Sequence, residues 1–72
     1  MSLLPKFAEN LAQMGANIEI TKDAGYLAPV VEKLVEIVVT NGGHITIDAT
    51  GYLPNFLEGF VRAGGNSVTI RV

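Results

Sequence analysis

The sequence predicts an α/β fold made of three α-β units, with a three-stranded parallel sheet in the order 1-2-3. All helices are expected on one face of this sheet, and the other face is expected to be open and polar. Three observations lead to this prediction: one residue pattern occurs three times, proline and glycine mark the ends of each expected helix, and each expected strand alternates between apolar and polar residues. Helices that alternate with strands are typical of parallel sheets.

The repeat divides a single domain, residues 1–72, into units of approximately 3–21, 26–50 and 52–72. Four sets of residues are equivalent when the units are aligned: Phe7, Val30 and Phe56; Ala8, Val31 and Leu57; Glu9, Glu32 and Glu58; and Leu11, Leu34 and Phe60. A tandem repeat in which each copy is one supersecondary unit predicts stacked units that share a continuous core.

Each unit is expected to begin with an amphipathic helix. Apolar residues recur at i, i+3, i+4, i+7 and i+8, which forms one apolar stripe on a helix. Pro5, Pro29 and Pro54 fall in the expected first turns, where the missing N–H leaves no helical hydrogen bond unmade. The helices are expected to stop at residues 15–17, 41–43 and 64–66, whose glycines suit the left-handed conformation that ends a helix.

The middle segment, residues 35–49, allows two interpretations. Residues 35–40 are rich in β-branched side chains, and Asn41-Gly42 followed by an alternating segment is a strong hairpin signal. The repeat favours a helix instead, because Val31, Leu34 and Val35 align with helical positions in both other units. We therefore expect a second helix about one turn longer than the other two.

The expected strands alternate strictly. Their apolar residues are Ile18 and Ile20; Ile45, Ile47 and Ala49; and Val68, Ile70 and Val72. A parallel sheet covered on both faces has nearly continuous apolar strands, so alternation predicts that helices cover only one face. Because crossover connections are right-handed, successive helices share a face only if the sheet grows in one direction. In this order the sheet never reverses its direction of growth. It therefore lacks the crevice at a reversal point where open α/β sheets usually bind ligands.

The open face is a candidate binding surface. The rows that cross it are expected to be Asn17, His44 and Ser67; Glu19, Thr46 and Thr69; and Thr21, Asp48 and Arg71. Neighbouring strands lie about 4.8 Å apart, so Asp48 is placed to pair with Arg71, and the threonines to form a short ladder. The candidate recognition residues are Glu19, His44, Thr46, Asp48, Thr69 and Arg71. The alternative is an ordinary solvated sheet face.

A second candidate surface is the rim where strands end and helices begin. It includes Lys22, Asp23, Asp48, Thr50 and Gly51. Helix N-termini attract anions, which makes this rim the best candidate for a small anion. The two carboxylates oppose an anion and equally suit helix capping. The tyrosines at equivalent repeat positions, residues 26 and 52, are expected to have a structural role at this rim.

Composition excludes several classes of function. The chain is 49% hydrophobic, and a domain of 72 residues buries only about 60% of its unfolded surface, so self-association is expected. A net charge of −2 with five scattered basic residues disfavours nucleic-acid binding and anionic lipid surfaces. The absence of cysteine excludes disulfides and thiol catalysis, and no apolar run approaches the ~18 residues of a membrane helix. A cytoplasmic location is the default expectation.

The leading functional hypothesis is a non-enzymatic protein-interaction or assembly module that uses the polar face, the sheet edges, or both. A small-molecule or anion-binding protein acting at the rim is the alternative. No phosphate loop, dinucleotide fingerprint, nucleophile elbow or paired-histidine metal helix occurs, so no cofactor or metal is expected. A small hydrolase or isomerase built on His44 and Asp48 is the least favoured class.

The periodicity of strands and helices resembles the αβ horseshoe type of leucine-rich repeat. No strand carries alternating leucines followed by an asparagine, which is the consensus of that family. The resemblance therefore concerns architecture alone, and no residue role follows from it.

Overall fold

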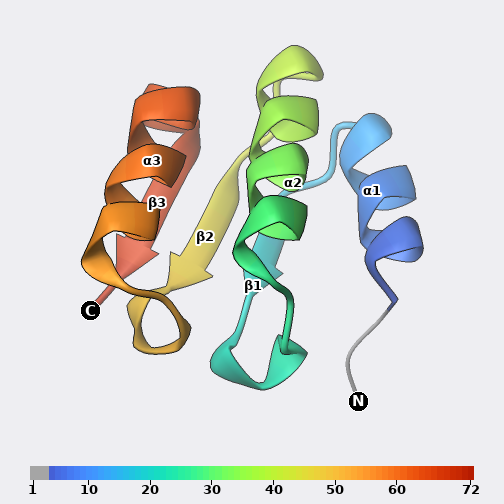
Figure 1. Ribbon diagram of the computed structural model, residues 1–72. Helices are drawn as coiled ribbons and strands as arrows, with labels where there is room; N and C mark the ends of the chain where they lie inside the picture. Colours follow the sequence, from blue (N-terminus) through green and yellow to red (C-terminus); the bar gives the residue numbers. More distant parts are fainter. Residues whose placement is uncertain (1–3) are drawn as a thin grey trace.

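The computed structural model describes residues 4–72, and the predicted start of the first unit at residue 3 lies outside them. Helices and strands alternate along the chain (Figure 1). In order they are α1 (Pro5–Gln13), β1 (Ile18–Ile20), η1 (Lys22–Ala24), α2 (Ala28–Thr40), β2 (Ile45–Asp48), η2 (Ala49–Gly51), α3 (Pro54–Gly64), η3 (Gly65–Ser67) and β3 (Val68–Arg71), where η denotes a 3₁₀ turn.

The strands form one parallel sheet in the order β1-β2-β3, as predicted. The register is in phase with the repeat: Ile18 pairs with Ile45, and Ile45 pairs with Val68. All three helices lie on one side of this sheet (Figure 1). The resulting two-layer molecule measures 28 × 28 × 18 Å, and its second sheet face is not covered by any described residue.

The helices begin where the leucine-proline pattern predicts. The N-cap residues Leu4, Leu27 and Leu53 have extended backbone conformations, which a following proline favours. None of the three N-cap side chains caps its helix, because leucine has no polar group. Their carbonyl groups accept the first helical hydrogen bonds, such as the one from Ala8 N–H to Leu4 O at 3.3 Å.

The middle segment is a helix and not a hairpin. α2 has 13 residues against nine in α1, a difference close to the predicted helical turn. α2 exceeds α3, which has 11 residues, by only about half a turn, so the predicted difference in length holds for the first helix alone. The segment that looked β-like lies in this helix because Leu34, Val35 and Val38 are fully buried there. Asn41 ends the helix by donating from Nδ2 to the Ile37 carbonyl at 2.8 Å. Gly42 follows at φ +75°, the left-handed conformation expected of a helix stop.

The strands are shorter than predicted. Ala49 was expected to continue the second strand but lies in the 3₁₀ turn η2, together with Thr50. The physical reason is local: the Asp48 carboxylate accepts a hydrogen bond from Thr50 N–H at 2.8 Å and turns the chain. Val72, expected on the buried face of the third strand, lies beyond β3 and is fully exposed.

The core lies between the helix layer and the sheet and is densest around the middle unit. Its fully buried large side chains are Val31, Leu34, Val35, Val38, Ile45, Ile47 and Phe60. The ring of Tyr52 packs edge-on against Phe60, with centroids 5.4 Å apart. Six of these seven side chains belong to the middle unit, which has a neighbouring unit on each side, and Phe60 belongs to the third.

Candidate interaction surfaces

The polar face has the predicted register. Glu19, Thr46 and Thr69 form one row across the three strands, and Asp48 stands opposite Arg71 in the next row. Glu19, Thr69 and Arg71 are exposed. The structure therefore brings these five predicted residues onto one solvent-facing surface.

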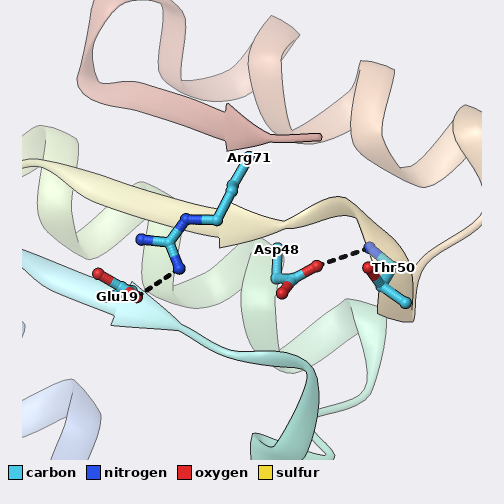
Figure 2. A network of polar contacts seen from close by, with 4 residues as sticks. All are labelled: Glu19, Asp48, Thr50 and Arg71. Carbon is cyan, nitrogen blue, oxygen red and sulfur yellow. Dashed lines mark hydrogen bonds and ion pairs between the residues drawn. The ribbon is translucent and has the colours of Figure 1, made fainter.

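The ion pair on this face is not the predicted one. Arg71 was expected to pair with its neighbour Asp48, but its Nη1 atom lies 2.8 Å from Glu19 Oε2, on the far side of β2 (Figure 2). An arginine side chain is long enough to reach past one strand, and Asp48 is already engaged with Thr50 N–H. The hydrogen bonds from Thr50 hold the pKa of Asp48 below its usual value, and the charges of Arg71 and Lys22 contribute in the same direction.

His44 precedes β2, and its Nε2 atom lies 2.6 Å from the hydroxyl oxygen of Thr69. Because Asp48 bonds to Thr50, the structure gives the two candidate catalytic residues separate partners. Within residues 4–72, no group of three or more His, Cys, Asp or Glu side chains is arranged to hold a metal ion.

The rim residues are brought together by two 3₁₀ turns. Lys22 and Asp23 lie in η1, Thr50 and Gly51 lie in η2, and these two turns contact each other. The turns separate the strand ends from the starts of α2 and α3, so the helix N-termini do not directly follow the strands. The Thr50 N–H, a donor that an anion would use, is bonded to the Asp48 carboxylate.

The two tyrosines connect these turns. Tyr52 donates a hydrogen bond from its hydroxyl to the Tyr26 carbonyl at 2.8 Å. Partial burial raises the pKa of Tyr52, and the neighbouring Tyr26 adds to this effect. The contact ties the rim of the second unit to that of the third, which is a structural role of the kind expected from the sequence.

The end of the molecule at β1 carries an apolar surface that sequence reasoning missed. Four exposed apolar residues recur along α1 at intervals of three or four: Leu4, Phe7, Leu11 and Met14. Beside them is a groove of about 410 Å³ along the open edge of β1, where Leu11, Ile18 and Tyr26 are among the lining residues. We call this surface the β1 end.

The opposite end of the sheet has a similar surface, which we call the β3 end. A shallow groove of about 490 Å³ lies between α3 and the open edge of β3. Its lining residues are Leu57, Glu58, Val61, Arg62 and Ile70. Both outer strands are thus accompanied by exposed apolar side chains from the adjacent helix.

A signal for these ends is present in the sequence. The stripe on α1 is visible from its spacing, but the same spacing occurs in the buried stripe of α2. Residue type does not distinguish the two, because Leu11 and Leu34 are equivalent leucines. Only the position of a unit within the stack determines whether its stripe is covered.

Comparisons with protein-family models, with curated proteins and with solved structures find no match for this chain. In the described part of the chain, none of the helices has the length and apolar character needed to cross a membrane.

Proposed function

We propose that this protein is a non-enzymatic protein-interaction or assembly module that binds through the two ends of its sheet. The observation that carries the proposal is the same at both ends: an unpaired strand edge lies beside exposed apolar side chains of a helix. Unpaired edges bind additional strands, and contiguous exposed apolar residues mark protein-interaction sites.

The backbone at the β1 end supports this role. Ile18 N–H donates to the His44 carbonyl at 2.8 Å, so the backbone polar groups of Ile18 face β2. Successive residues of a strand direct their backbone groups to alternate sides, which aims those of Glu19 at the open edge. Glu19 is one of the residues that line the β1 groove, which is where an added strand would pair with it.

The polar face gives less support for a binding site. Its charged and polar side chains already have partners: Arg71 pairs with Glu19, His44 with Thr69, and the Asp48 carboxylate with the backbone N–H of Thr50. A partner on this face would have to replace these contacts. An anion site at the rim is also less well supported. The Thr50 N–H that could bind an anion already donates a hydrogen bond to the Asp48 carboxylate.

A photo-crosslinking amino acid tests the proposal in cells that naturally contain the protein. The crosslinker replaces Leu11 at the β1 end, Val61 at the β3 end, Thr46 on the polar face, or Val39 on the outer surface of α2. We expect protein adducts from the first two positions only. Adducts from Thr46 alone would move the binding site to the polar face, and no adducts at any position would overturn the proposal.

A further inference from the structure

We infer that the partner at both ends is a second copy of this chain, stacked head to tail. In this arrangement β3 of one copy pairs in parallel with β1 of the next, and α1 of the next copy covers the new junction. The inference rests on the proposed function, because it names the partner of the same two end surfaces. It depends on repeat positions that are buried inside the molecule and exposed only at its ends.

The first such position faces the preceding unit. Leu11, Leu34 and Phe60 are equivalent in the repeat. Leu34 and Phe60 are fully buried, whereas Leu11 is 41% exposed and lines the β1 groove. The first unit is the one with no described unit before it. Leu11 is thus a large apolar residue like Leu34 and Phe60, but no described unit covers it as the preceding units cover those two residues.

The second position faces the following unit. Ala12, Val35 and Val61 are equivalent in the same alignment. Ala12 and Val35 are fully buried, whereas Val61 is 43% exposed and lines the β3 groove. The exposed positions are therefore complementary: Leu11 lies on the side that would face a preceding unit, and Val61 lies on the side that would face a following unit. Stacking two copies head to tail buries Leu11 of one against the Val61 region of the other.

The strand register continues across the same junction. Ile18 pairs with Ile45, and Ile45 pairs with Val68, so the next pairing in the series is Val68 with Ile18 of the next copy. The backbone N–H and C=O of Ile18 face β2, the strand of the following unit. Val68 is equivalent to Ile18, so its N–H and C=O face the open edge of β3, where a following unit would lie. The backbone N–H and C=O of Glu19 face the open edge of β1, where a preceding unit would lie. The two open edges therefore match as one parallel ladder.

Helix α1 has the position that this junction requires. In Figure 1, α1 lies beside β1 at one side of the molecule, with no strand of the sheet behind it. Exposed apolar side chains of this segment are Phe7, Leu11 and Met14, and Leu11 lines the β1 groove. A strand supplied by the preceding copy would lie beneath this overhanging helix, and α1 would in turn occupy the groove beside α3.

Polar contacts between the helices follow the same repeat. Glu9 Oε1 lies 3.4 Å from Lys33 Nζ on the next helix. The same contact position recurs between the second and third helices, where Glu32 is equivalent to Glu9 and Gly59 is equivalent to Lys33. A Cβ placed on Gly59 would lie 3.9 Å from Glu32 Oε1. Continuing the series places Glu58 beside Asn10 of the next copy. Lys6, one turn before Asn10, adds a complementary positive charge on that side of α1.

Such a contact joins two different surfaces, so it does not close on itself as a two-fold dimer does. A substitution at either end therefore stops a variant from associating with itself but leaves its other end intact. Complementation between two variants blocked at opposite ends becomes a direct test. The matched control is Val39, which has the same residue type and the same 43% exposure as Val61 but lies on the middle helix.

The experiment measures mass by light scattering across a dilution series for the whole chain, with folding of each variant checked by circular dichroism. We expect the wild type and the Val39→Glu variant to associate equally. The Leu11→Glu and Val61→Glu variants should each remain monomeric. An equimolar mixture of these two variants should form a heterodimer and nothing larger, since one intact β1 end and one intact β3 end remain.

Three results would overturn the inference: a wild type that is monomeric throughout, a mixture that does not associate, or a blocked variant that associates like the wild type. A second measurement is independent of the blocking variants. The Asn10→Lys substitution should tighten association about twofold to fivefold by pairing with Glu58, and salt should remove this gain. A monomeric wild type with end-specific crosslinks to other proteins would overturn stacking and leave the proposed function standing.

Discussion

Arg71 on β3 reaches across the middle strand to Glu19 on β1, with 2.8 Å between Nη1 and Oε2 (Figure 2). The pair joins the two outer strands, which have no backbone contact with each other. About half of each side chain is exposed to solvent, at 53% and 49%. Water and salt therefore screen the attraction, and the pair orders the polar face more than it stabilises the fold.

A double-mutant cycle with Glu19→Gln and Arg71→Gln should give a coupling energy of about 0.2–1 kcal/mol. The measurement is urea unfolding at low and at high salt concentration. The coupling should shrink as salt rises, because both groups are exposed. A coupling above about 2 kcal/mol that is insensitive to salt would contradict this account.

Equivalent leucines should differ strongly in their contribution to stability. Leu34→Ala removes a fully buried side chain next to Val31 and Val35 in the core, and should lower the free energy of unfolding by about 2–5 kcal/mol. Leu11→Ala acts on a partly exposed leucine and should cost about 1 kcal/mol or less in dilute monomeric protein. Urea unfolding at low protein concentration compares them. Equal losses would contradict the different burial of the two residues.

Gly64 should not tolerate a side chain. A Cβ at this position would overlap Val68 and lie 2.9 Å from Val35 Cγ1, so Gly64→Ala should destabilise the protein by about 1–3 kcal/mol. Gly51→Ala is the matched control, because a Cβ there meets nothing within 4 Å and its φ is not in the left-handed region. Thermal unfolding should show an unchanged or slightly raised midpoint for the control.

Stability should fall at alkaline pH because of Tyr52. Its pKa is raised in the folded protein by partial burial, so the folded state holds the phenolic proton more tightly than the unfolded state. The stabilisation that Tyr52 provides is complete below the pKa of an unfolded tyrosine, about 10, and is lost as the pH rises through the pKa of Tyr52 in the folded protein. Urea unfolding from pH 8 to 11 should show this decline.

The Tyr52→Phe variant supplies the control for that pH series. It keeps the ring beside Phe60 but loses the hydrogen bond to the Tyr26 carbonyl, which should cost about 0.5–1.5 kcal/mol at neutral pH. The difference from the wild type should narrow above pH 10. A difference that stays constant with pH would assign the alkaline decline to other groups.

The strand order and the helix starts were predictable because several independent signals agree on them. For residues 35–40 the repeat predicted a helix, whereas local propensity predicted a strand. The segment is a helix, because the helix buries Val35 and Val38 completely. The end of the second strand was not predictable from alternation. Asp48 and Thr50 fit a strand pattern, but a side-chain hydrogen bond between them turns the backbone instead.

The candidate surfaces were predictable in position but not in their contacts. The strand register brought Glu19, Thr46 and Thr69 into one row as expected. The partner of Arg71 depends on how far a long side chain reaches, which periodicity does not encode. The sheet edges were among the predicted interaction surfaces, but the exposed apolar side chains beside them were missed. Burial of Leu11 or Val61 depends on whether a neighbouring unit is present, and residue type does not indicate that.

The four-residue difference in length between α2 and α1 has a consequence for how such a chain changes over generations. An α-helix completes a turn in about 3.6 residues, so an insertion of four returns the following side chains nearly to their original direction. An insertion of two rotates them by roughly 200° and brings polar residues inward. Genes for this scaffold are therefore expected to tolerate helix insertions of four codons and to lose those of two.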